Sequence, residues 1–72
     1  MAGLNHIVIG QNIRRIRMEK GWTQKDLSIS AALSVSQVSR LERGMASMTV
    51  TTFFKLCNAL TCKPADLLKD AE

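Results

Sequence analysis

The middle of the chain carries two closely spaced helix-start signals of the same design. Thr23 is followed three residues later by Asp26, and Ser34 is followed three residues later by Gln37. In such a capping box, a hydroxyl and an acidic or amide side chain satisfy backbone N–H groups that the first helical turn leaves unpaired. Two short capped helices in succession, the second closed by Gly44, predict a helix-turn-helix.

Hydrophobic periodicity extends this reading to the whole chain and predicts an all-α fold. Apolar residues at Ile9, Ile13 and Ile16 mark one face of a first helix. Trp22 and Leu33 each precede a capping residue and can act as hydrophobic staples. The predicted compact domain has five helices, at residues 5–20, 24–31, 35–43, 49–60 and 64–68.

Length and charge bound the possible functions. Seventy-two residues make one domain, 1–72, and a hydrophobic content of 46% indicates a globular chain. We expect the polar tail, 69–72, to fray. The formal net charge of +4 favours a polyanionic partner, although by itself it fits ordinary solubility equally well.

Several classes of site are not expected. Cys57 and Cys62 are too few for a disulfide framework, and the single histidine, His6, lies far from them, so no metal site is predicted. We expect no cofactor and no small-molecule ligand, because the chain leaves no room for an effector domain. No apolar run approaches membrane-spanning length and no signal peptide is visible, which predicts a cytoplasmic protein without membrane contact.

The order and spacing of these features resemble the lambda-repressor-like DNA-binding domains, the Cro/CI or XRE family, over residues 9–68. The resemblance implies a five-helix domain with the helix-turn-helix as its second and third helices. The residues that carry it are Ile9-Gly10, Ile13-Arg14, Ile16-Arg17, Thr23-Gln24, Leu27, Ser34, Val38-Ser39-Arg40-Leu41-Glu42-Arg43-Gly44, Phe53, Leu56, Ala59-Leu60, Pro64 and Leu67-Leu68.

Two positions depart from the family pattern. Ala32 occupies the turn position where the family usually has glycine. If that residue is left-handed, alanine costs roughly 1–2 kcal/mol there. Ser28 occupies the position of a usual small residue in the first motif helix, and we expect this change to be benign because serine is also small.

The outward face of the helix at 35–43 is small, polar and basic, as a helix in the DNA major groove needs to be. The resemblance places the N-terminal part of this helix in that groove. Gln37 can alternatively complete its capping box, and the whole face can alternatively be solvated. The predicted base-reading residues are Val35, Ser36, Gln37, Ser39 and Arg40.

A second set of residues is predicted to bind DNA phosphates. The resemblance implies that Gln24 touches the backbone and buttresses the recognition helix. Backbone N–H groups at a helix start favour an anion in any case. For Thr49, simple helix capping is an equally good explanation. The predicted phosphate-binding residues are Thr23, Gln24, Lys25, Arg43 and Thr49.

The resemblance implies two structural features besides DNA contact. Arg17 and Glu42 are expected to form an ion pair between the first and third helices. Related domains dimerise around the loop after the third helix and the two helices that follow, so a homodimer is predicted; a sticky monomer is the alternative. The predicted dimer interface includes Met48, Val50, Phe54 and Leu68.

These features predict a sequence-specific double-stranded DNA-binding transcriptional regulator, a homodimer on a roughly palindromic operator. Free-standing domains of this kind resemble restriction–modification controller proteins and small phage repressors. The alternative is a protein-interaction or antitoxin-like module with the same fold. An enzyme is not expected, because no nucleophile–base pair or carboxylate dyad stands at a readable spacing.

Overall fold

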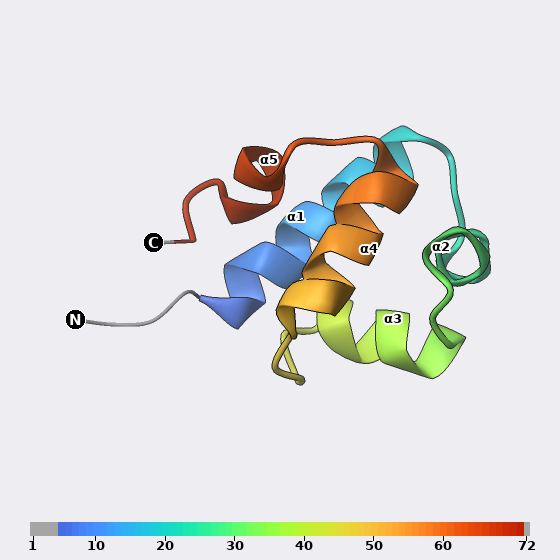
Figure 1. Cartoon of the computed structure of the whole chain (residues 1–72), viewed down its shortest axis with the longest axis horizontal. Helices are drawn as coiled ribbons and strands as arrows, with labels where there is room; N and C mark the ends of the chain where they lie inside the picture. Colours follow the sequence, from blue (N-terminus) through green and yellow to red (C-terminus); the bar gives the residue numbers. More distant parts are fainter. Residues whose placement is uncertain (1–4, 72) are drawn as a thin grey trace.

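The computed structural model describes residues 5–71 and confirms the all-α prediction. These residues form five helices, which short connections join (Figure 1). No helix among the described residues is long and apolar enough to cross a membrane. The helices are α1 (His6–Glu19), α2 (Gln24–Ala31), α3 (Val35–Glu42), α4 (Val50–Leu60) and α5 (Pro64–Leu68).

Side-chain caps set the starts of the first four helices. Asn5 accepts from the backbone N–H groups of the first turn of α1. The two predicted capping boxes form at Thr23 and Ser34, and Thr49 caps α4. These caps satisfy donors that would otherwise lack partners, so the four starts follow from local chemistry.

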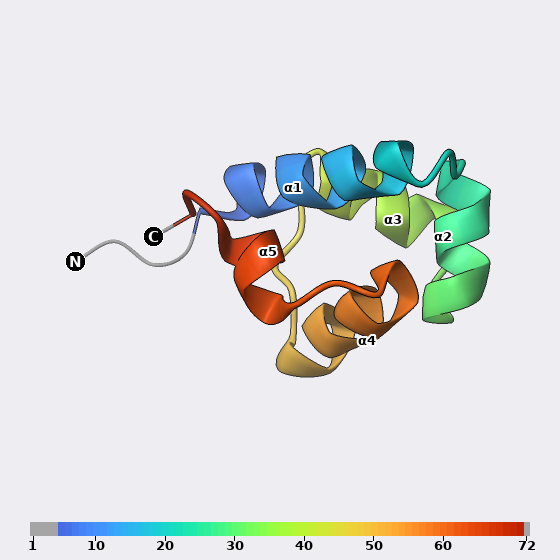
Figure 2. The ribbon, with the colours of Figure 1, turned by 90° about the horizontal axis from the view of Figure 1, so that it is seen from above.

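The core lies between two layers. Figure 2 shows α1 and α3 on one side and α4 on the other, with α2 closing one end and α5 the other. The largest fully buried side chains come from all five helices, so the recognition helix shares one core with the rest of the domain. They are Ile13, Leu27, Val38, Leu56, Leu60 and Leu67.

Gly10 marks the closest approach between α1 and α3. A Cβ atom at this position would overlap the carbonyl oxygen of Leu41 and lie 2.8 Å from that of Glu42. Both obstacles are backbone atoms, which cannot move aside as a side chain can. A glycine inside α1 normally costs about 1 kcal/mol against alanine; here it permits the close crossing that seats α3.

Ala32, in the turn of the helix-turn-helix, is left-handed, with φ 56° and ψ 45°. The family usually has glycine at this position, and alanine is sterically disfavoured in the left-handed conformation. The backbone N–H of Ala32 still bonds to the carbonyl of Ile29, so the turn keeps its geometry despite the alanine. The steric clash of the Ala32 Cβ therefore raises the free energy of the folded state.

The expectation of a frayed tail is wrong for the described residues after α5. Ala71 is only 1% exposed, and its carbonyl accepts from the backbone N–H of Asn5 at 2.8 Å. The buried Asn12 side chain donates to the carbonyl of Lys69 at 2.9 Å. The polar composition of residues 69–72 predicted a solvated tail. However, Asn5 and Asn12 form hydrogen bonds with the backbone carbonyls of this segment. Glu72 lies outside the described residues.

Candidate nucleic-acid interface

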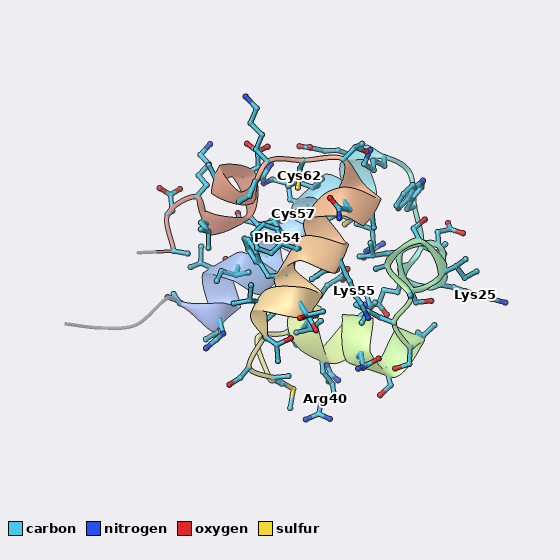
Figure 3. All side chains as sticks on the ribbon, in the orientation of Figure 1. Lys25, Arg40, Phe54, Lys55, Cys57 and Cys62 are labelled. Atoms are coloured by element: carbon cyan, nitrogen blue, oxygen red, sulfur yellow. The ribbon has the colours of Figure 1, made fainter. Side chains whose placement is uncertain are left out.

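The helix α3 presents a polar outer face. Val38 and Leu41 turn into the core, whereas the predicted base-reading side chains turn outward. Figure 3 shows Arg40 pointing away from the body of the domain. Val35 is 43% exposed, so its methyl groups are accessible to a thymine methyl group. Ser36, Gln37 and Arg40 are exposed, and Ser39 is half-buried.

Gln37 performs the capping role in this structure. Its Oε1 accepts from the backbone N–H of Ser34 at 2.8 Å, and the Ser34 hydroxyl accepts from the N–H of Gln37 at 3.0 Å. The side-chain Nε2 stays on the exposed surface as a donor. Base reading by Gln37 therefore remains a prediction, and it would use Nε2 while Oε1 holds the cap.

The predicted Arg17–Glu42 ion pair is present and buried. Arg17 Nε lies 2.6 Å from Glu42 Oε2, and Nη2 donates to Oε1 at 3.1 Å. The third guanidinium nitrogen, Nη1, donates to the backbone carbonyl of Trp22 at 2.6 Å. The side chains are only 10% and 3% exposed, so this two-pronged contact ties α1 to the end of α3 with little solvent screening.

Gln24 extends this link to α2. Its Nε2 donates to Glu42 Oε1 at 3.1 Å. The carboxylate of Glu42 thus receives donors from α1 and α2 at once. This is the buttress implied by the resemblance, and it orients the recognition helix against both neighbours.

Two threonines among the predicted phosphate-binding residues act as helix caps. Thr23 Oγ1 accepts from the backbone N–H of Asp26 at 3.1 Å. In return, the backbone N–H of Thr23 donates to the Asp26 carboxylate, which lowers the pKa of that carboxyl. Thr49 Oγ1 accepts from the N–H of Thr52 at 3.1 Å. Both threonines are exposed, but the Thr49 hydroxyl also donates to Thr52 Oγ1 at 3.1 Å. Phosphate binding by either hydroxyl stays a prediction.

Lys25 and Arg43 are exposed cations near the motif. Figure 3 shows Lys25 directed into solvent from α2. Arg43 follows α3, and its Nε donates to the carbonyl of Ser39 at 3.3 Å. Its two terminal nitrogens are left for an external acceptor. Phosphate binding by Lys25 and Arg43 stays a prediction.

Two hollows flank α3. The first, about 260 Å³, opens toward α1 and α2; the second, about 170 Å³, opens toward α4. Sequence reasoning did not single out Arg14 for the first hollow, although Arg14 precedes Arg17 by three residues and so shares its side of α1. The first is lined by Arg14, Arg17, Gln24, Ser39, Glu42 and Arg43, and the second by Gln37, Arg40, Leu41, Ala46, Ser47 and Thr52.

The structure brings the four predicted dimer residues together on another face. They line one apolar hollow of about 360 Å³, between α4, α5 and the start of α1. Val50 is 71% exposed and Phe54 is 49% exposed, while Met48 and Leu68 are half-buried. The Phe54 ring lies edge-on to that of Phe53, at 5.6 Å between centroids.

The two cysteines lie away from this surface. Cys57 is buried in the core, and burial raises the pKa of its thiol to about 11. It therefore packs as a small apolar side chain, as expected. Within residues 5–71, no group of three or more histidine, cysteine, aspartate or glutamate side chains is placed to hold a metal ion.

Comparison with known proteins agrees with this geometry. A curated relative is the HTH-type transcriptional regulator y4dJ of Sinorhizobium fredii. It is 36% identical over 61 residues, which cover 85% of this chain and 79% of the relative. The alignment spans most of both proteins, so the likeness is not confined to the short motif.

Two solved structures share the whole fold. The restriction-modification controller protein C.AhdI from Aeromonas hydrophila superposes with a TM-score of 0.83 at 32% identity, covering 86% of this chain and 94% of that one. The clp gene regulator ClgR from C. glutamicum gives 0.84 at 30% identity, covering 93% and 87%. The profile of the Cro/C1-type HTH DNA-binding domain matches residues 12–71. The chain therefore belongs to the Cro/C1-type helix-turn-helix family of DNA-binding domains.

Proposed function

We propose that this chain reads a specific double-stranded DNA operator as a homodimer. It is a helix-turn-helix DNA-binding transcriptional regulator by family, and that family is not enzymatic. The observation that carries the proposal is the exposed polar face of α3, held in place by the buried Arg17–Glu42 pair. A face that reads bases must be both accessible and rigidly oriented. Because the target is DNA, we propose that the protein acts in the cytoplasm.

Arg40 is the main candidate for base discrimination. Its exposed guanidinium can donate two parallel hydrogen bonds to O6 and N7 of a guanine, worth about 1–3 kcal/mol of discrimination. We propose that Val35, at the start of α3, contacts a thymine methyl group. We assign shorter-range polar contacts with base edges to Ser36, Gln37 and Ser39.

The phosphate contacts set position and affinity. Gln24 and Thr23 lie at the start of α2. The capping box pairs the N–H groups of Thr23 and Asp26, so those of Gln24 and Lys25 are left for an anion. Lys25, in α2, and Arg43, at the end of α3, add positive charge. Thr49 caps α4 and lines the apolar hollow around Phe54, and we propose its exposed hydroxyl as a further phosphate contact. Such contacts fix the register of the protein on DNA without reading sequence.

The homodimer is proposed to form through the apolar hollow around Phe54. The exposure of Val50 and Phe54 is high for apolar residues, and burying them against a second copy would stabilise a domain whose own core is small. A two-fold dimer of helix-turn-helix domains places two recognition helices about 34 Å apart, in successive major grooves. The operator should therefore be a rough inverted repeat.

Selection from a random duplex library tests this proposal. The expected winner is an inverted repeat whose half-sites lie about one helical turn apart, bound by two protomers in sedimentation analysis. A single unrepeated half-site bound by one protomer would contradict the dimer. The absence of any enriched sequence would contradict sequence reading altogether. C.AhdI is a restriction-modification controller protein, and we propose a comparable regulatory role for this chain.

The same apolar face supports a second candidate, a protein-interaction or antitoxin-like module. Val50 and Phe54 would then cover a different protein rather than a second copy. The two candidates separate by mutation. If Phe54→Glu abolishes regulation in cells while Arg40→Ala leaves it intact, the interaction module is favoured. The opposite pattern supports DNA reading.

A further inference from the structure

The hollow between α1, α2 and α3 has a charge imbalance. Three of its six lining residues are arginines, and Glu42 is the one acidic residue among them. The charges of Arg17 and Glu42 neutralise each other, because both groups are buried and in contact in the lining of the hollow. The positive charges of Arg14 and Arg43 are left facing the open space.

The hydrogen-bond partners of these groups show which remain available. All three guanidinium nitrogens of Arg17 donate to groups within the domain, at Glu42 and at the carbonyl of Trp22. Among the described residues, Arg14 has no acidic partner and Arg43 has only one bond, from Nε to a carbonyl. Arg14 and Arg43 therefore carry unused donors into the hollow.

The chemistry of this hollow suits a phosphate group. Guanidinium groups bind phosphate oxygens through parallel hydrogen bonds, and a recess lined by like charge concentrates the field that attracts an anion. Gln24 is the first residue of α2, so the positive end of that helix adds to the field. Near the buried pair, solvent screening is reduced.

The position of the hollow relative to α3 identifies the phosphate. Ser39 and Arg43 lie four residues apart and line this flank, whereas Arg40 and Gln37 line the opposite one. In a helix-turn-helix, the helix before the recognition helix crosses the DNA backbone. The start of that helix, at Gln24 of α2, lines this hollow and not the opposite one. We propose that Arg14, from outside the helix-turn-helix, joins Arg43 in binding one backbone phosphate in this hollow. This inference rests on the proposed DNA-binding mode.

Salt titration of DNA binding tests the role of Arg14, with fluorescence anisotropy of a labelled duplex as the readout. The variant is Arg14→Ala, and the matched control is Arg15→Ala. Arg15 is the next residue of α1 and carries the same charge, but it is paired with Glu19 at 3.6 Å and does not line the hollow. Both arginines are exposed, but Arg15 also donates to Asn12 Oδ1 at 3.4 Å. Thermal unfolding of both variants is therefore measured first, and the titration is run well below the lower melting temperature.

We expect Arg14→Ala to reduce the slope of log K against log salt by about 0.9 for each protomer bound. Its affinity should fall about tenfold per protomer, on selected and scrambled duplexes alike. Arg14→Lys should keep the parent slope, because it keeps the charge. Arg15→Ala should keep both the slope and most of the affinity.

An unchanged slope in Arg14→Ala, or an equal loss in Arg15→Ala, would overturn the assignment, because the effect would then be absent or generic. The proposed function is tested separately, by the affinity of the parent chain for selected and scrambled duplexes. If the parent binds selected and scrambled duplexes equally, sequence reading fails. The difference in slope between the two variants still decides whether the hollow holds a phosphate.

Discussion

Arg17 and Glu42 join α1 to the last turn of α3 through two contacts between one guanidinium and one carboxylate, at 2.6 Å and 3.1 Å. Gln24 adds a third donor to the same carboxylate. The recognition helix is thus held by a buried polar link as well as by the core. Its orientation therefore depends on a carboxylate that is buried inside the domain.

Glu42→Ala should lower the free energy of unfolding by about 3–5 kcal/mol, because it leaves the Arg17 guanidinium buried without a counter-charge. The matched control is Glu19→Ala, which breaks the exposed pair with Arg15 and should cost about 1 kcal/mol or less. Urea unfolding followed by circular dichroism measures both. Equal, small losses in the two variants would show that the buried pair does not hold α3.

Gly10→Ala should destabilise the domain by about 1–3 kcal/mol, although alanine favours helices. The added Cβ would overlap backbone carbonyls of α3, so the two helices would have to separate. Gln11→Ala, on the exposed face of the same helix, should change stability by no more than about 0.5 kcal/mol. A Gly10→Ala variant as stable as the parent would mean that α1 and α3 can move apart without loss of stability.

Ala32→Gly should stabilise the chain by about 1 kcal/mol, because glycine adopts the left-handed conformation without the Cβ clash. Ser30→Gly, in the exposed part of α2, should destabilise it by about 0.5–1 kcal/mol. Thermal unfolding of the two variants gives shifts of opposite sign if this account holds. A loss of stability in both would show that Ala32 is not strained.

The capping box of α2 should give a pH dependence. The hydrogen bond from the backbone N–H of Thr23 lowers the pKa of Asp26 below its ordinary 3.8. A carboxyl with a lowered folded pKa stabilises the fold above its unfolded pKa and loses that effect as the pH falls through the folded value. The melting difference between the parent and Asp26→Asn should therefore be constant well above pH 3.8 and shrink as the pH falls below that value. A difference independent of pH would contradict this role.

Arg40→Ala should leave the fold intact, because the side chain is exposed, and should relax the preference at one base pair of each half-site. The expected loss of discrimination is about 1–3 kcal/mol at that position. Titration of operators mutated one base pair at a time reveals it. A weakening that is uniform over all sequences would identify Arg40 as a phosphate contact instead.

Much of the fold was predictable because its helix starts are local. Thr23, Ser34 and Thr49 cap helices through side chains that bond within three residues, and such signals are visible in a linear sequence. The left-handed Ala32 was anticipated only as a condition attached to the family resemblance. The ion pair of Arg17 and Glu42 was likewise implied by that resemblance.

Other features depend on contacts between distant segments and have no local signal. Asn12 holds the backbone after α5 from a position that periodicity marks only as a helical polar residue. The need for glycine at position 10 comes from carbonyls of α3, more than thirty residues away. Arg14 was one cation among several in α1, and only the folded arrangement places it beside Arg43.

The most direct test of sequence reading by α3 is the ratio of two dissociation constants. They are measured by anisotropy at physiological salt, for the selected duplex and for a scrambled duplex of the same composition. The account predicts that the selected duplex binds at least about a thousandfold more tightly. Comparable affinities for the two duplexes, both lost as salt is raised, would show that only the positive charge binds DNA, and would contradict the assignment of α3 as a recognition helix.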